Sequence, residues 1–199
     1  SYDYLYSDIL NVMRFYDNHD ATRLFPEEVG PGDLEKFKQA YTILLTIPGI
    51  PQLFYGSEFM ISGNTKKDFA YVRPEIPGGW EGDKKNYFKK SGFTEYQNQA
   101  WDFLQKLLQW RKGNDVIANG AMKHFKVQNG VYVYERKLGN RQVLVVLNGD
   151  ENTSVLPLAN YKEVLNKVTL GKDIITGKTI ELQDSIILGS KEVLILELK

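Results

Sequence analysis

The pattern of hydrophobic and polar positions changes in character about half-way along the chain. In the first part, short apolar runs at 11–16 and 50–56 alternate with segments at 34–47 and 95–112, where apolar residues recur every three or four positions. Short apolar runs are typical of buried strands, and the second spacing is typical of amphipathic helices. Strands that alternate with helices predict βα units and a parallel sheet.

Both predicted helices carry signals at their ends. Asp33 is placed to cap the N-terminus of the first helix, and Pro48-Gly49 ends it. Thr94-Glu95-Tyr96-Gln97 resembles a capping box at the start of the second helix, and Gly113 is a natural stop for it. We therefore expect the helices to begin and end at these residues.

The long segment at 59–93 follows neither period and is rich in Gly and Pro. A loop of this length inside a domain is usually either functional or disordered. Aromatic residues favour packed surroundings, so their presence here argues for an ordered loop. The aromatic residues concerned are Tyr71, Trp80, Tyr87 and Phe88.

After about Asn119, short alternating strands replace the helical pattern. Asn129-Gly130 and Gly139-Asn140 are typical of the tight turns of β-hairpins. The alternation predicts a small antiparallel β-sandwich, separate from the α/β part. Clear strands are expected at 122–127, 131–136, 141–147 and 192–198.

Two strand–helix units are too few to make a whole α/β domain. They cannot cover both faces of a parallel sheet, and closing a barrel takes eight strands. We therefore expect residues 1–118 to be the C-terminal part of a larger α/β domain and residues 119–199 to be a β domain. On this interpretation the chain is a piece of a longer polypeptide.

Composition excludes some classes of function. Lys plus Arg and Asp plus Glu number 25 each, so the formal net charge is zero, which argues against a nucleic-acid partner. A neutral partner such as a sugar fits this balance better. There is no cysteine for a disulfide or a thiolate metal site, and no apolar run has the length of a membrane span. Ser1-Tyr2-Asp3-Tyr4 does not resemble an export signal, which leaves the compartment of a longer protein unknown.

Asn18-His19-Asp20, directly after the first predicted strand, is the sharpest chemical signal. A carboxylate at the C-terminal end of a parallel strand stands where barrel enzymes place catalytic residues. Its oxygens can bind sugar hydroxyls or a positively charged transition state, and a neighbouring histidine can hydrogen-bond a hydroxyl. The same run would also form an Asx turn, in which Asn18 or Asp20 only caps backbone N–H groups.

A second run, Gly49-Ile50-Pro51-Gln52-Leu53-Phe54-Tyr55-Gly56-Ser57-Glu58, covers the second predicted strand and its exit. Together with Phe15-Tyr16-Asp17-Asn18-His19-Asp20, it resembles glycoside hydrolase family 13, the α-amylase family. In that family the two segments belong to the seventh and eighth strands of a (β/α)8 TIM barrel. The resemblance implies that residues 1–118 are the last βα units of such a barrel and residues 119–199 the family's C-terminal antiparallel β-sandwich. The run Pro77-Gly78-Gly79-Trp80-Glu81-Gly82-Asp83 further resembles the neopullulanase and cyclomaltodextrinase-like branch.

The resemblance also implies roles for particular side chains. Asp20 corresponds to the third catalytic carboxylate, which binds hydroxyls of the reacting sugar and favours its oxocarbenium-like form. Arg73 corresponds to an arginine that contacts sugar, although the segment between Glu58 and Arg73 is longer than in common α-amylases. Trp80 would be a stacking platform for a glucose ring, or would only pack within its loop. The expected substrate-binding residues are His19, Asn18, Arg23, Arg73 and Trp80.

The parent implied by the resemblance is a retaining α-glucan hydrolase that cleaves α-1,4, and in some relatives α-1,6, glucosidic bonds. The family's Asp nucleophile and Glu acid/base follow the fourth and fifth strands, and no Gly-x-Arg-x-Asp run occurs here. We therefore expect this chain alone to be inactive. No cofactor or metal site is expected in it, and any calcium would be bound elsewhere in the parent.

Other interpretations stay open. The chain would also suit a carbohydrate-binding protein without catalysis, or an unrelated interaction protein in which Asn18-His19-Asp20 is an ordinary cap. A glucanotransferase would use a sugar hydroxyl in place of water on the same covalent intermediate. The expected partner is an α-glucan or maltooligosaccharide, and an incomplete barrel would expose apolar faces suited to self-association. The resemblance is compatible with the bacterial periplasm or an extracellular location.

Overall fold

The computed structural model describes residues 3–199; Ser1 and Tyr2, where the search for an export signal began, lie outside the described residues. The chain divides into two compact units, each built from separate segments. The boundary expected between residues 118 and 119 stays a prediction. The first unit, here called the β unit, is Ser1–Val12, Gln39–Ile50 and Lys106–Lys199, and the second, the loop unit, is Met13–Lys38 and Pro51–Gln105.

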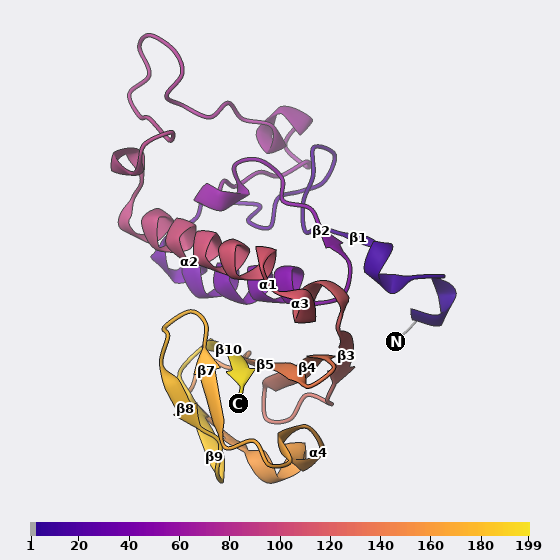
Figure 1. Ribbon diagram of the computed structural model, residues 1–199. Coiled ribbons are helices and arrows are strands. Elements are labelled where there is room, and N and C mark those ends of the chain that lie inside the picture. The colour runs from indigo at the N-terminus through magenta and orange to yellow at the C-terminus, as the bar shows by residue number, and fades with distance from the viewer. Residues whose placement is uncertain (1–2) are drawn as a thin grey trace. The chain divides into compact units, whose positions relative to one another are not determined.

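The β unit contains an antiparallel six-stranded sheet in the order β3-β4-β5-β10-β7-β8 and a two-stranded sheet of β6 and β9 (Figure 1). β10, the last strand in sequence, lies inside the larger sheet, between β5 and β7. The expectation of antiparallel strands in the second half is therefore confirmed. The strands are β3 Ala121–His124, β4 Val131–Leu138, β5 Arg141–Asn148, β6 Ser154–Pro157, β7 Leu170–Asp173, β8 Thr179–Glu181, β9 Ser185–Leu188 and β10 Val193–Leu198.

Tight turns join the first of these strands, as the sequence predicts. Asn129 and Gly130 have φ values of 50° and 74°, which only turns of the primed type require of two successive residues. Gln128 and Val131 exchange backbone hydrogen bonds across this turn. Gly139, with φ of 59°, turns the chain between β4 and β5. Both turns set the register of neighbouring strands through local backbone geometry.

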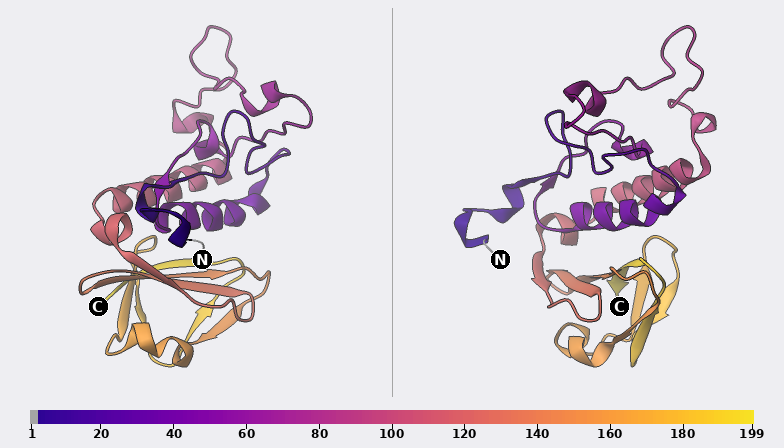
Figure 2. Two further views of the ribbon diagram at one scale, coloured as in Figure 1. Left: turned by 90° about the vertical axis from the view of Figure 1, so that its right-hand side faces the viewer. Right: turned by 180° about the vertical axis from the view of Figure 1, so that it is seen from behind.

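Hydrophobic side chains from both sheets share one core within the β unit. Val133, Leu144 and Leu196 of the six-stranded sheet are at most 1% exposed. Leu156 and Leu188 of the two-stranded sheet belong to the same cluster. Figure 2 shows the strands arranged around this core in two further views. Alternate residues of β4, β5 and β10, together with residues of β6 and β9, thus belong to one shared interior, as expected of a β-sandwich.

Two long helices match the predicted ones and run through both units: α1 Leu34–Thr46 and α2 Glu95–Lys112. α3 Asp115–Asn119 follows α2 directly and was not expected, and α4 Lys162–Leu165 is a single turn. None of the helices formed by residues 3–199 combines the length and the apolar character that a membrane crossing requires. The 3-10 turns are η1 Asp3–Leu5, η2 Ile9–Asn11, η3 Pro31–Asp33, η4 Ser57–Phe59, η5 Phe69–Val72, η6 Lys90–Gly92 and η7 Leu158–Tyr161.

Of the two caps predicted at the N-termini of the long helices, the one at α2 is confirmed and the one at α1 is wrong. Thr94 and Gln97 form the predicted capping box of α2, because the Gln97 N–H donates to Thr94 Oγ1 at 3.3 Å and the Thr94 N–H donates to Gln97 Oε1 at 3.0 Å. Asp33 does not act as expected ahead of α1. It ends η3, and its carboxylate accepts a hydrogen bond from the Gly30 N–H at 3.0 Å.

Two arginines of the β unit bind carbonyl groups at the C-terminal end of α1. Arg111 donates to the Leu45 carbonyl at 2.6 Å, and the fully buried Arg136 donates to the carbonyls of Thr46 and Gly120. Burial, and then the charge of Arg111, lower the pKa of Arg136 to about 10, so it remains a cation at neutral pH. The cations satisfy carbonyls that a helix end leaves without partners.

A short sheet of β1 Met13–Arg14 and β2 Ile50–Pro51 stands where the sequence predicts two longer strands. The Ile50 N–H donates to the Val12 carbonyl and the Gln52 N–H to that of Arg14, which is the hydrogen-bond pattern of a parallel pair. The parallel direction is as expected, but each strand has only 2 residues.

The expected burial of the first strand is also wrong for this chain. Met13, Phe15 and Tyr16 are 55%, 41% and 37% exposed. Among residues 3–199, the sheet consists of β1 and β2 alone, so no neighbouring strand or covering helix layer of a larger sheet shields these side chains.

Candidate functional site

The Asp20 carboxylate lies at the surface of the loop unit, after a turn made by Asn18. The Asn18 side-chain oxygen accepts a hydrogen bond from the Asp20 N–H at 2.8 Å, so the Asx turn is present. That turn leaves the Asp20 side chain free for other partners, and it is 64% exposed. Its Oδ2 lies 3.2 Å from Nε2 of His19. The local cap and a chemical role for Asp20 are therefore compatible.

Arg73, which lies far along the sequence from Asp20, binds the loop that carries Asp20. Its Nη2 donates to Asp20 Oδ1 at 2.8 Å, and its Nε donates to the backbone carbonyl of His19 at 2.8 Å. The guanidinium carbon also lies 5.5 Å from the centre of the Phe69 ring. An ion pair this exposed adds little to stability, so its two-point geometry matters mainly for aiming the carboxylate. The structure thus brings Asn18, His19, Asp20 and Arg73 together.

A buried carboxylate lies behind the exposed pair. Asp17 is 3% exposed, and its Oδ2 accepts a hydrogen bond from the Leu24 N–H at 3.2 Å. The Ser57 hydroxyl donates to Asp17 Oδ1, also at 3.2 Å. Ser57 comes from η4, after β2, whereas Asp17 follows β1. The Ser57–Asp17 bond therefore joins the segment after β1 to the segment after β2. The sequence did not predict this buried contact.

Arg23, expected to bind substrate, is 2% exposed. Its Nε donates to the Val72 carbonyl at 3.0 Å, and its Nη1 donates to the Tyr55 carbonyl at 2.6 Å. Its guanidinium carbon lies 4.1 Å from the centre of the Phe54 ring. Arg23 thereby ties the exit of β2 to the residue just before Arg73. A direct contact with a sugar would require this burial to be relieved.

Gly63 allows the loop that carries Arg73 to approach the loop that carries Asp20. The Arg23 N–H donates to the Gly63 carbonyl and the Gly63 N–H to the Phe25 carbonyl, both at 2.9 Å. A Cβ at position 63 would lie 2.4 Å from the backbone oxygen of Tyr71, and real contacts are never so short. Only glycine fits between these backbones, which makes Gly63 part of how the site is assembled.

Trp80 stands apart from this cluster, in a turn organised by Asp83. The Asp83 carboxylate accepts hydrogen bonds from the N–H groups of Gly78 at 2.6 Å and Trp80 at 3.1 Å. These bonds, that of Gly78 first, lower the pKa of Asp83. The Trp80 side chain is 77% exposed, so its ring faces are open to a ligand. No contact between Trp80 and Asp20 is present in the loop unit as described.

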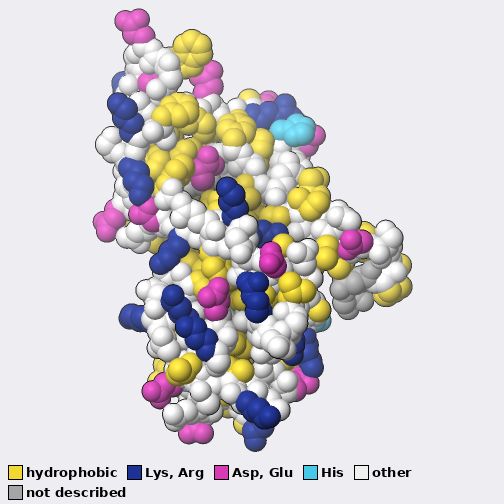
Figure 3. All heavy atoms as spheres, viewed as in Figure 1, with side chains coloured by type: hydrophobic (Ala, Val, Ile, Leu, Met, Phe, Trp, Pro, Cys, Tyr) yellow, Lys and Arg dark blue, Asp and Glu magenta, His cyan; other side chains and the backbone are white. Residues whose placement is uncertain are grey.

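The aromatic residues of the long loop are less packed than expected. Tyr71 and Phe88 are 58% and 71% exposed, like Trp80, because turns and backbone hydrogen bonds order this segment instead of a hydrophobic core. Tyr87 is the exception, with its ring 5.4 Å from that of Phe59. Figure 3 shows hydrophobic side chains at the surface of the loop unit, consistent with these exposures.

A cavity of about 410 Å³ in the loop unit was missed by sequence reasoning. Most of its lining is aromatic, and one lining carboxyl, that of Glu58, has its pKa raised by burial. The residues come from four separate stretches of sequence, so no single motif could have revealed the cavity. They are Tyr55, Glu58, Phe59, Ile76, Tyr87, Phe88, Lys90, Phe93 and Trp101.

The cluster around Asp20 can bind hydroxyl groups and stabilise positive charge, because it offers an exposed carboxylate with a fixed orientation. The His19 imidazole, beside the Asp20 carboxylate, is a second group that can hydrogen-bond a hydroxyl. The residues from 3 to 199 include no group of three or more His, Asp or Glu side chains that could hold a metal ion. Within the cluster, Asp20 is the only exposed carboxylate, whereas retaining cleavage of a glycosidic bond requires two further carboxyl roles.

Comparison with known proteins relates the chain to cyclomaltodextrin glucanotransferases and α-amylases. The family model for the cyclo-malto-dextrinase C-terminal domain matches residues 122–197. A cyclomaltodextrin glucanotransferase from Bacillus sp. (strain 38-2) is 31% identical over 86% of this chain and 22% of its own length. An α-amylase from Niallia circulans is 30% identical over 87% of this chain and 30% of its own length.

A solved structure shares the fold of this chain. The crystal structure of an α-amylase from Geobacillus thermoleovorans, complexed with acarbose, matches 96% of this chain and 39% of its own chain, with a TM-score of 0.69 at 18% identity. At this identity the match shows a shared fold. The chain spans 22% and 30% of the length of the two curated relatives.

Proposed function

We propose, from the premise that this chain belongs to glycoside hydrolase family 13, the α-amylase family, that it is the C-terminal part of a retaining enzyme acting on α-glucans. The observation that carries the proposal is the Arg73–Asp20 pair, with an Nη2–Oδ1 distance of 2.8 Å, in the two loops that leave the short parallel strands. Loops at the C-terminal ends of parallel strands are where barrel enzymes build their active sites. We infer that β1 and β2 are the seventh and eighth strands of a barrel whose earlier strands belong to the parent protein.

Asp20 in this proposal grips the hydroxyls of the reacting sugar and favours its flattened, oxocarbenium-like form. Arg73 neutralises one side of the carboxylate and aims it, while Oδ2 remains beside His19 for a sugar hydroxyl. The nucleophile and the acid/base would come from the parent protein. Asn18 and Arg23 then act as positioning residues, since one holds the turn and the other the loop before Arg73.

The substrate class follows from the same arrangement. A neutral polyhydroxylated chain suits an exposed carboxylate, an amide and an open aromatic ring better than an anionic ligand does. We propose α-1,4-linked glucans and maltooligosaccharides as substrates, with α-1,6 bonds as a further possibility for the assay to resolve, and Trp80 as a stacking platform. No cofactor is proposed for this chain, and any structural calcium would be bound by the rest of the parent.

The decisive experiment is Asp20→Asn in the full-length protein. The amide keeps the shape of the side chain but loses its charge, so hydrolysis of soluble starch should fall by about 10³-fold or more while substrate binding persists. The rate would be measured as released reducing ends, with circular dichroism to confirm an intact fold. A rate within a few-fold of wild type would overturn the role of Asp20. Absence of activity in the wild-type full-length protein on every α-glucan would overturn the function itself.

Transfer to a sugar hydroxyl is a second candidate function. It is favoured by one specific observation, the 31% identity to a cyclomaltodextrin glucanotransferase. Incubation of the full-length enzyme with maltoheptaose distinguishes the two outcomes, since a transferase yields longer or cyclic products and a hydrolase yields shorter linear ones. The role proposed for Asp20 is the same in both, because both pass through a glycosyl-enzyme intermediate.

Self-association of the isolated chain is a further proposal. Met13, Phe15 and Tyr16 near β1 are exposed, and so is Tyr55 after β2. In a closed barrel, neighbouring strands and helices would cover such side chains. Size-exclusion chromatography of the isolated 199-residue chain should therefore show a concentration-dependent dimer or larger species, and a monomer at all concentrations would contradict this.

A further inference from the structure

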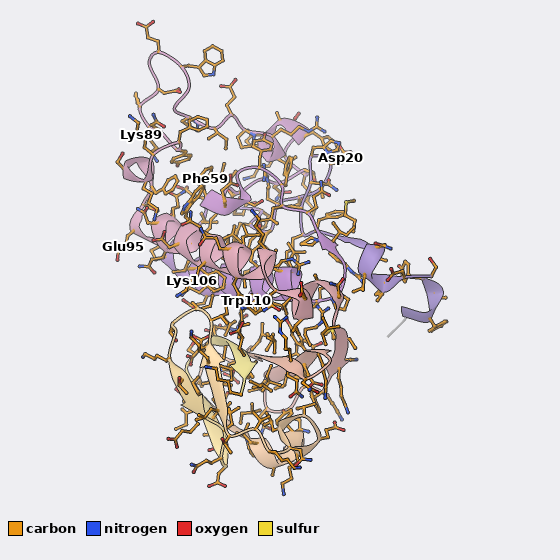
Figure 4. The ribbon with its side chains drawn as sticks, in the orientation of Figure 1. Asp20, Phe59, Lys89, Glu95, Lys106 and Trp110 are labelled. Atoms are coloured by element: carbon orange, nitrogen blue, oxygen red, sulfur yellow. The ribbon has the colours of Figure 1, made fainter. Side chains whose placement is uncertain are left out.

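The aromatic cavity of the loop unit is a built site that the proposed function does not use. Its volume of about 410 Å³ lies within the usual range of small-molecule sites, roughly 300–1,000 Å³. Phe59 and Trp101 form its floor, with parallel rings 5.4 Å apart at an angle of 7°. Figure 4 shows Phe59 among other rings beside α2, in a different part of the loop unit from the loop that carries Asp20.

The walls of the cavity are held in place without a ligand. Phe93 lies 5.0 Å from Phe59 and 5.6 Å from Trp101, so the three rings pack as one cluster. The Gln97 side chain donates to the Phe59 carbonyl at 3.0 Å, which ties η4 to the first turn of α2. A pre-formed site loses less conformational entropy on binding than one that must be ordered. Phe88 is the exception among the lining rings, since it is 71% exposed.

Polar groups stand at defined points of this aromatic lining. The Glu58 carboxyl faces the cavity, and its desolvation raises its pKa, so it favours neutral hydrogen-bond partners over further anions. Lys90 forms an ion pair with Asp102, which neutralises the ammonium group at the cavity edge. The cavity combines ring faces with hydrogen-bonding groups, the combination that fits the apolar C–H faces and hydroxyl edges of a sugar.

A short stretch of chain that follows Arg73 links the Arg73–Asp20 pair to the cavity. The Tyr55 hydroxyl donates to the Pro74 carbonyl at 3.0 Å, and Tyr55 lines the cavity. Ile76, another lining residue, follows Arg73 by three positions in the sequence. A chain-like ligand held at Asp20 would thus have this cavity within the same loop system.

We propose that the cavity lined by Glu58, Phe59, Phe88 and Trp101 is a separate binding site for the glucose units of an α-glucan chain. The proposal rests on the proposed function for its ligand class. Glucose rings stack on the aromatic lining, and their hydroxyls bond to the Glu58 carboxyl. The site retains a glucan near Asp20 and takes no part in breaking the bond.

Trp101 provides a direct reporter, because it is one of only three tryptophans in the chain. In a Trp80→Phe/Trp110→Phe background, Trp101 is the sole tryptophan, and excitation at its red edge avoids the tyrosines. Titration of this protein with maltoheptaose should give a saturable change in its emission, and titration with the β-linked cellohexaose should not.

Phe88→Ala is the test variant and Tyr71→Ala its matched control. Both side chains are exposed aromatics of the same loop, but only Phe88 lines the cavity. Loss of one stacking ring should raise the dissociation constant for maltoheptaose about fivefold to tenfold, while Tyr71→Ala should stay within about twofold. Glu58→Gln, which preserves the shape of the side chain, should also weaken the binding of maltoheptaose. Its far-ultraviolet circular dichroism should match that of the unsubstituted chain.

The possible results separate the two proposals. An emission of Trp101 that does not respond to saturating maltoheptaose, or responds equally in Phe88→Ala and in the control, overturns the cavity site. If starch hydrolysis by the full-length protein still depends on Asp20, the proposed function survives that failure. If Trp101 responds and Phe88→Ala weakens the response, but the full-length protein acts on no α-glucan, then the cavity site stands and the proposed function fails.

Discussion

The sheets of the β unit and the Asp20 cluster of the loop unit are specified by the sequence in opposite ways. In the sheets, β4 and β5 pair through a turn of two residues, so their register is fixed by neighbours in sequence. In the cluster, the decisive bond joins Arg73 to Asp20 across 53 positions. Stability in the first region resides in buried apolar contacts, and orientation in the second resides in exposed polar ones. Function and stability should therefore separate under mutation.

The largest expected loss of stability follows Leu144→Ala in β5. Leu144 is fully buried in the core shared by the two sheets, and such truncations cost about 2–5 kcal/mol. Urea unfolding of the chain, followed by circular dichroism, measures the change. Ile187→Ala in β9 is the control, because Ile187 is 69% exposed and its loss should cost less than about 0.5 kcal/mol. Equal losses would show that the core has been wrongly located.

Arg23→Ala should come next, although Arg23 supports the loop that carries Arg73. Its removal leaves the carbonyls of Val72 and Tyr55 without this donor, at a cost of roughly 2–4 kcal/mol. Arg73→Ala, which breaks an exposed ion pair, should cost about 1 kcal/mol or less. The same urea titration compares the two arginines. A larger loss of stability for Arg73→Ala than for Arg23→Ala would contradict the assignment of Arg23 as the buried structural residue and of Arg73–Asp20 as an exposed ion pair.

A smaller effect is expected from the pH dependence that Glu58 contributes. Burial raises the pKa of its carboxyl above the ordinary 4.5, so the native state binds its proton more tightly than the unfolded state. The free energy of unfolding should therefore decrease as pH rises from 4.5 through the raised native pKa. Glu58→Gln should flatten this part of the pH profile of urea unfolding. An unchanged profile in the variant would assign the dependence to other groups.

The smallest effect on stability is expected from Asp20→Asn, where the largest effect on catalysis is proposed. The Asp20 side chain is 64% exposed and its partners are solvated, so the free energy of unfolding should change by less than about 0.5 kcal/mol. The measurement is the urea midpoint of the isolated chain. A loss comparable with that of Leu144→Ala would mean that Asp20 has a structural role, and the contrast between the two regions would then fail.

The sequence predicted those features that local chemistry determines. The turn at Asn129-Gly130 requires positive φ values that few other pairs adopt, and the capping box at Thr94 needs only residues three apart. The periodicities of α1 and α2 likewise persist over several turns. Each of these signals lies within one short window of sequence, which is why it could be read directly.

Features that depend on distant contacts were not predictable in the same way. The length of β1 depends on which strands pair with it. With β2 as its partner in a two-stranded sheet, β1 extends over only 2 residues. The burial of Arg23 beneath Val72, and the cavity against Trp101, arise only when the long loop folds back. The Asn18-His19-Asp20 motif located the cluster, but its partner Arg73 came from the family resemblance and not from spacing.

The central place of β10 in its sheet has a consequence for synthesis of the protein. β5 pairs with β10 from Val143 to Leu147, although four strands, β6 to β9, come between them in sequence. Until Glu197 has left the ribosome, the β3–β5 meander keeps one open edge and β7 lacks its partner. Local hairpins close within microseconds, but this closure must await the synthesis of β10. A chain truncated before residue 193 should therefore keep exposed strand edges and be prone to proteolysis and aggregation.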